Sequence, residues 1–187
     1  MKIQFVYDRP SQISTDLLVV ILDSKIKLHD LTGNLLEEIV GRVGRDLNEK
    51  RLKKEYFTSL DSRTGAQYVV IFSTILEPSY NIWESLKIFV ARSIRMARDH
   101  GISRVCVVLN TEEAAPFIGK AVEGAILGAY TFDRYKTEKA EFHKVEVTIA
   151  ALKSHDQQNR HYLQRYTAVS DAVNEARDMI KIGRAHV

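Results

Sequence analysis

Few side chains in this 187-residue chain combine a reactive type with a spacing that supports catalysis or metal binding. Cys106 is the only cysteine and lies in an apolar run, so we expect a buried, unreactive thiol rather than a nucleophile. His155 and His161 lie six residues apart without the Cys or His neighbours of a zinc site, which favours a solvated loop. Glu112–Glu113 could act as paired carboxylates, but beside Thr111 they more simply stabilise the positive end of a helix dipole.

Three arginines at three-residue spacing could form a phosphate-binding stripe on one helix. These are Arg92, Arg95 and Arg98, with Lys87 further along the same segment. An amphipathic helix also needs a solvated polar face, and we favour that interpretation. The net charge of +3 is too mild to indicate nucleic acid, and the chain contains neither a Walker loop nor a GxGxxG dinucleotide motif.

The hydrophobic pattern predicts the elements that must position these groups. Three apolar runs of strand length are typical of strands buried on both faces of a sheet, and apolar residues at helical spacing alternate with them. Gly101 stands where a left-handed helix cap is expected. We therefore predict strands at 3–7, 16–22, 56–60, 67–74, 105–109 and 145–152, with helices at 31–43, 81–100, 115–130 and 159–181.

The last predicted helix carries an apolar stripe with alternating spacings of four and three residues. This spacing places the residues of the stripe on one face of the helix. Its members are Tyr162, Tyr166, Val169, Val173, Ala176 and Ile180.

The segment Glu123–Lys136, with the sequence EGAILGAYTFDRYK, is the most distinctive part of the chain. Gly124 and Gly128 lie four residues apart in a predicted helix, and small residues at that spacing let another backbone approach closely. Tyr130, Phe132 and Tyr135 then alternate with polar residues, which indicates a short extended segment. Asp133 and Lys136 within it are best explained by a surface ion pair or turn hydrogen bond.

This segment resembles the N-terminal domain of the leucyl aminopeptidase (cytosol aminopeptidase) family, in which EG-x-x-L-G-x-Y-x-F-D-x-Y-K recurs. Ala91–Arg98 followed by Gly101–Val105 is similar to a helix-to-strand segment of that domain, and Asn174–Ile180 is similar to its E-x-A-R-D-L segment. The resemblance covers about residues 1–181. It implies an α/β fold with a mixed sheet sandwiched between helices, similar to the macro domain.

The resemblance also implies that the chemistry of the family lies outside this chain. A full-length relative would release N-terminal amino acids from peptides, using two divalent metals (zinc, manganese or magnesium) in a C-terminal catalytic domain, and would form a cytoplasmic hexamer. The family's N-T-D-A-E-G-R motif is absent here. We therefore assign no catalytic, cofactor-binding or metal-ligating residue and expect no cofactor in this chain. A peptide substrate would bind only to the missing catalytic domain.

We divide the chain into three parts on this basis. Residues 1–158 form the N-terminal α/β domain, and 159–181 form a helix that would lead to the catalytic domain. Residues 182–187 read IGRAHV where the family continues differently, and this peptide resembles a translated sequencing adapter. We interpret 182–187 as a non-native tail and the chain as truncated. No apolar run is long enough for a membrane span and no signal peptide is evident, so we expect a cytoplasmic location without membrane contact.

Two alternative functions remain open from the sequence. A macro-domain-like fold could bind ADP-ribose or a related nucleotide, although fold alone does not imply function. The arginine stripe and the basic pI of about 8.9 would permit a DNA-binding domain, which we favour less.

Overall fold

The computed structural model describes residues 1–6, 13–22, 55–59, 66–73, 82–109, 114–131, 144–151 and 156–184. The predicted helix at 31–43, together with His155, Glu112–Glu113 and residues 132–136, lies outside these ranges. The strands are β1 (Lys2–Val6), β2 (Leu17–Leu22), β3 (Glu55–Ser59), β4 (Tyr68–Ser73), β5 (Arg104–Leu109) and β6 (Glu146–Ala151). The helices are α2 (Ile82–Asp99), α3 (Ala114–Ala129) and α4 (Asp156–Arg184).

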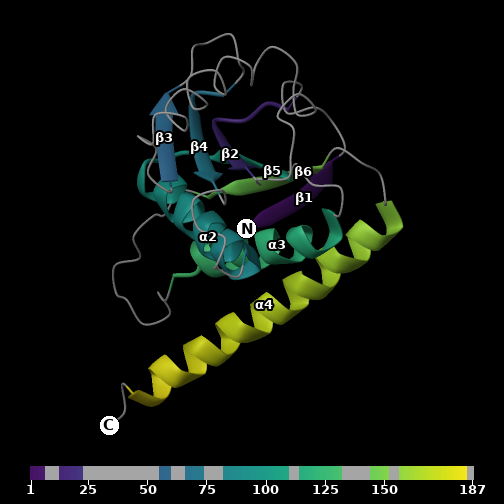
Figure 1. Cartoon of the computed structure of the whole chain (residues 1–187). Helices are drawn as coiled ribbons and strands as arrows, with labels where there is room; N and C mark the ends of the chain where they lie inside the picture. Colours follow the sequence, from purple (N-terminus) through teal and green to yellow (C-terminus); the bar gives the residue numbers. More distant parts are fainter. Residues whose placement is uncertain are drawn as a thin grey trace.

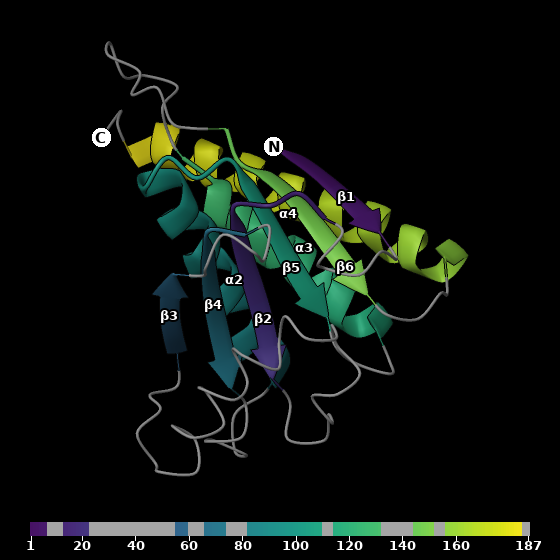
Figure 2. The ribbon, with the colours of Figure 1, turned by 90° about the horizontal axis from the view of Figure 1, so that it is seen from above.

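The six strands form one mixed sheet in the order β1-β6-β5-β2-β4-β3 (Figures 1 and 2). The pairs β1–β6, β6–β5, β5–β2 and β2–β4 are parallel, and only the edge strand β3 is antiparallel to its neighbour β4. Helix α2 stands between β4 and β5 in the chain, and α3 stands between β5 and β6. The predicted mixed sheet of an α/β domain is therefore confirmed.

Helices α2 and α3 cover one face of the sheet, and α4 lies on their outer side against α3 (Figure 1). Side chains on both faces of the central strands are buried, as the continuous apolar runs predict. Leu17 and Val107 belong to the core cluster formed with α2 and α3, whereas their neighbours Leu18 and Cys106 are equally buried outside that cluster.

The apolar stripe of α2 forms the centre of the core. Leu86, Val90, Ile94 and Ala97 are fully buried, and Phe89 is 2% exposed. The helix ends one residue before His100, and Gly101 follows in the left-handed conformation with φ of 70°. The amide of Ile102 then donates to the carbonyl of Ala97, which closes the helix end in the expected way.

Only the first two residues of the apolar stripe of α4 pack against the core. Tyr162 and Tyr166 pack against the core cluster, but Val169, Val173, Ala176 and Ile180 are exposed to solvent. The face of α4 that packs on the domain in this half is polar and includes Ser170, which is 1% exposed. Periodicity identifies residues that share a helix face, but it does not identify the partner of that face.

Candidate functional site

The contact between α2 and α3 is built on the two glycines of the Glu123–Lys136 segment. A Cβ atom on Gly124 would lie 2.5 Å from the carbonyl oxygen of Lys87, and one on Gly128 would lie 2.6 Å from that of Ala91. Neither position has room for a side chain, because in both cases the nearest atom belongs to the backbone of α2. The predicted close approach of another element at Gly124 and Gly128 is therefore confirmed.

Four charged side chains connect the first turns of α2 to the middle of α3. Lys120 of α3 donates to Glu84 of α2 at 3.1 Å and to Glu123 at 2.8 Å, and Lys87 lies 3.4 Å from Glu123 and also pairs with Glu84. Hydrogen bonds from Lys87 and Lys120 hold the pKa of Glu84 below its ordinary value, and the bond to Glu123 raises the pKa of Lys120. Each charge therefore has an opposite partner, as expected of a structural network.

Tyr130, the residue that follows α3, holds the end of α4. Its hydroxyl donates to Oδ1 of Asp178 at 2.6 Å. The guanidinium of Arg177 and the ammonium of Lys181 lie 5.6 Å and 5.4 Å from the centre of its ring, within range of a cation–π interaction. The aromatic residue predicted to begin an extended segment thus acts as a contact between α3 and α4.

A second ion pair fixes the start of β2 against β5. Arg104 Nη2 donates to Asp16 Oδ1 at 2.6 Å, and the backbone amide of Arg104 donates to Asp16 Oδ2 at 3.0 Å. These bonds hold the pKa of Asp16 below its ordinary value. The 88-residue separation of the partners left no local signal by which the sequence could reveal this pair.

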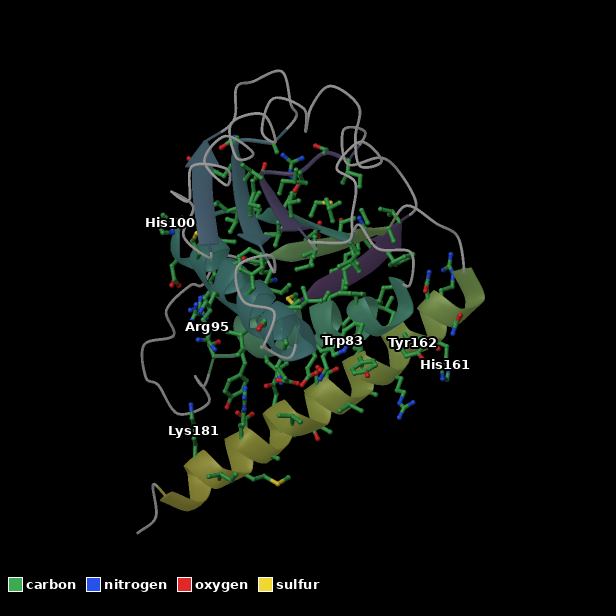
Figure 3. The ribbon with its side chains drawn as sticks, viewed as in Figure 1. Trp83, Arg95, His100, His161, Tyr162 and Lys181 are labelled. Carbon is green, nitrogen blue, oxygen red and sulfur yellow. The ribbon has the colours of Figure 1, made fainter. Side chains whose placement is uncertain are left out.

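The structure places the remaining predicted groups apart from one another. Cys106 is fully buried in β5, and burial raises the pKa of its thiol to about 12, which confirms the prediction of an unreactive cysteine. His161 is exposed on the amino-terminal half of α4 (Figure 3), within the helix predicted at 159–181 and not in a loop.

Fewer cations of α2 are exposed than the three-residue spacing of the arginines suggests. Arg92 and Arg95 are exposed, and Figure 3 shows Arg95 on the outside of the helix layer. Arg98 has a side chain only 15% exposed and pairs with Asp99 at 3.0 Å, while Lys87 belongs to the network with α3. Arg98 and Lys87 therefore pair with acidic residues of the domain, and Arg92 and Arg95 lie on the exposed face that the spacing predicts.

A groove of about 760 Å³ lies between the start of β1, the end of α3 and the middle of α4. Its walls mix aliphatic and polar side chains, and the polar groups on the α4 side are Gln164, Thr167, Asp171 and Asn174. Oδ1 of Asn174 is buried with no hydrogen-bond partner in the described structure. Within the ranges described, no group of three or more His, Cys, Asp or Glu side chains could hold a metal ion, and no helix is long and apolar enough to cross a membrane.

The segment that contains Gly124 and Gly128 matches a known protein family. Residues 83–139 match the cytosol aminopeptidase family, N-terminal domain. The match spans α2, β5, α3 and the Glu123–Lys136 segment, and confirms the resemblance to this domain of the family. Among curated proteins, no sequence matches the chain at a significant level.

Solved structures with the same fold include two enzymes and a macro domain. A mutant of tomato leucine aminopeptidase superimposes with a TM-score of 0.65 at 14% identity, over 92% of this chain and 36% of its own. The bottromycin maturation enzyme BotP gives a TM-score of 0.56 at 18% identity, over 88% of this chain and 32% of its own. The macro domain of ganglioside induced differentiation associated protein 2 gives 0.57 at 13% identity, over 88% of this chain and 84% of its own. This chain therefore spans about a third of the two enzymes, and the macro-domain-like fold is confirmed.

Proposed function

We propose that this chain is the N-terminal, non-catalytic assembly or regulatory domain of a leucyl aminopeptidase-like metalloaminopeptidase. The observation that carries the proposal is the α2–α3 contact, because the family segment supplies the glycines that this contact requires. The segment also supplies Tyr130, which holds α4. The distinctive residues of the family match thus serve helix packing, which suits a domain that supports chemistry performed elsewhere.

In the proposed parent enzyme, α4 connects this domain to the catalytic domain. The parent would release N-terminal amino acids from peptides with two divalent metals (zinc, manganese or magnesium) and would assemble as a hexamer in the cytoplasm. Two closely spaced metals would stabilise the attacking and leaving atoms of the hydrolysis. The length of the tomato enzyme, of which this chain covers 36%, leaves room for such a domain.

The proposal is tested by incubating the purified chain with a leucine anilide and manganese. We expect no turnover above the buffer blank, with tomato leucine aminopeptidase as the positive control in the same assay. Turnover that follows the chain through purification would contradict a non-catalytic role. Circular dichroism on the same sample distinguishes an inactive folded domain from an unfolded chain.

The genomic sequence beyond the codon for Lys181 tests the parent assignment independently. We expect an open frame that continues into a catalytic domain with an N-T-D-A-E-G-R motif and does not encode IGRAHV. An unchanged IGRAHV followed by a stop codon would contradict the interpretation of 182–187 as a non-native tail.

A nucleotide-binding module is the second candidate function. It is favoured by the macro domain named above, which this chain matches over 84% of that domain's length. Calorimetry with ADP-ribose separates the two candidates. Micromolar affinity would favour the nucleotide-binding function, whereas absence of heat at millimolar ligand would leave the assembly domain as the better account.

A further inference from the structure

The groove between the start of β1, the end of α3 and the middle of α4 has the size of a binding site for a small organic molecule. Its volume is about 760 Å³, within the range of roughly 300–1,000 Å³ that small-molecule sites occupy. Apolar side chains from all three elements line it, including Ile3, Ile126 and Leu163. A ligand with an apolar body would bury surface there, and the polar groups of the walls select its chemistry.

The α4 wall of the groove presents hydrogen-bond acceptors. Oδ1 of Asn174 is buried and has no hydrogen-bond partner in the described structure. Asp171, three residues earlier on the same helix face, is exposed and forms no ion pair within the described ranges. The hydroxyl of Thr167 donates to the carbonyl oxygen of Leu163 at 2.8 Å, so toward a ligand it can only accept. Each of these three groups can therefore take a donor from a ligand.

A primary ammonium group is the donor that matches this wall. It carries three N–H donors and a positive charge, whereas amide and hydroxyl donors are neutral. Its charge complements the carboxylate of Asp171, and charge-assisted hydrogen bonds are stronger than neutral ones. One of its N–H groups would also supply the donor that Oδ1 of Asn174 lacks, which removes the cost of an unsatisfied buried acceptor.

The β1 end of the groove carries the opposite charge. Lys2 lines the groove and forms no ion pair within the part of the chain that the structure describes. An adjoining pocket of about 350 Å³ shares Lys2 and is also lined by Arg98, Lys144 and Glu146. Arg98 pairs with Asp99 of its own helix, so the lysines Lys2 and Lys144 stand against the single carboxylate of Glu146. This end therefore complements an anionic group such as a carboxylate.

We propose that this groove binds a small zwitterion whose ammonium and carboxylate groups stand at opposite ends of an apolar body. The ammonium group lies against Asp171 and Asn174, and the carboxylate lies toward Lys2. In the described structure Lys2 and Asp171 line one groove from two elements without pairing with each other, so a ligand can neutralise both charges. The site goes beyond the proposed assembly or regulatory role and does not rest on it.

Titration of the isotopically labelled chain with 6-aminohexanoate, followed by NMR, tests the proposal. This probe carries its two charged groups at opposite ends of an unbranched alkyl chain. We expect saturable shifts of the amide signals of β1 and of the middle of α4, with a dissociation constant of about 1–10 mM. Absence of saturable shifts up to about 50 mM, or shifts confined to other elements, would overturn the proposal.

Three compounds of similar size identify the groups that the site recognises. Hexylamine lacks the carboxylate of the probe, and hexanoate lacks its ammonium group. Norleucine is an isomer of the probe that carries both charges on one carbon. We expect each compound to bind at least about threefold more weakly than 6-aminohexanoate, as the loss of one exposed ion pair implies. Binding of any of the three as tightly as the probe would overturn the proposed arrangement.

Substitutions assign the two ends of the ligand. Asp171→Asn should weaken binding of 6-aminohexanoate about threefold or more and leave hexanoate unchanged, whereas Lys2→Gln should weaken both and leave hexylamine unchanged. Asn174→Leu should weaken the probe, and unchanged binding in this variant would contradict the role of its Oδ1 atom. Glu175→Gln is the matched control for Asp171→Asn, because Glu175 is an exposed carboxylate of α4 outside the groove lining. Equal weakening by this control would overturn the site.

Discussion

Replacing Gly128 with alanine should destabilise the domain, although alanine is the better helix former by about 1 kcal/mol. The added Cβ atom would lie 2.6 Å from the carbonyl oxygen and 2.7 Å from the Cα of Ala91. Ordinary contact begins at 3.4 Å, so α2 and α3 would have to separate by about 0.8 Å at this point. Both obstructing atoms belong to the backbone and cannot rotate away.

The net effect follows from two opposing terms. Overpacking of a close-packed core costs about 1–3 kcal/mol, and a rigid backbone contact belongs at the upper end of that range. After the gain in helix propensity, we expect a loss of about 2 kcal/mol in the free energy of unfolding, or a fall of about 4–8 °C in Tm. Urea denaturation followed by circular dichroism measures this loss.

Gly119→Ala is the matched comparison in the same helix. It makes the same gain in helix propensity, but its Cβ atom meets the ring of Tyr166, a half-buried side chain that can move with α4. We expect a smaller loss of global stability than for Gly128→Ala. A Gly128→Ala variant as stable as the wild type, or more stable, would refute the predicted loss, because the cost of the backbone contact would then not exceed the gain in helix propensity.

Three further predictions concern single contacts. Tyr130→Phe removes the hydrogen bond to Asp178, and we expect several-fold faster amide hydrogen exchange in the last turns of α4 with little change in Tm. The folded pKa of Asp16 is lowered by Arg104, so this pair stabilises the fold above about pH 4 and is lost as pH falls through the lower folded pKa; Asp16→Asn should flatten the acid limb of a stability–pH curve. Cys106 should resist Ellman's reagent in the native chain and react completely in urea, and rapid native labelling would contradict its burial.

Local pattern predicts the elements of this fold more fully than their contacts. The apolar runs around Leu17, Val70 and Val107 identify strands within two residues of their observed ends, because a strand buried on both faces has no polar positions. The glycine pair in α3 also carries a local signal. Two small residues four positions apart in a helix indicate close contact with another backbone, and α2 makes that contact. Each of these signals is contained within a few neighbouring residues.

Contacts between distant segments could not be read from the sequence in this way. Lys87 lies on the same helix as the three arginines and was grouped with them. In the structure it pairs with Glu123 of α3 and is therefore not part of an exposed basic stripe. Tyr130 and Asp178 are 48 residues apart, and nothing near either residue indicates the other. The identity of a partner depends on which helices become neighbours, and this is decided by the packing of the whole domain.

Helix α3 is the element through which the family segment affects the rest of the molecule. Gly124 and Gly128 set the distance from α3 to α2, which rests on the sheet, and Tyr130 at the end of α3 sets the rotation of α4. A change at either glycine therefore moves Tyr130, and with it the direction in which α4 leaves the domain. If α4 connects to a catalytic domain as proposed, the Glu123–Lys136 segment determines where that domain stands relative to this one. Its distinctive sequence is then explained by geometry between domains rather than by chemistry within this one.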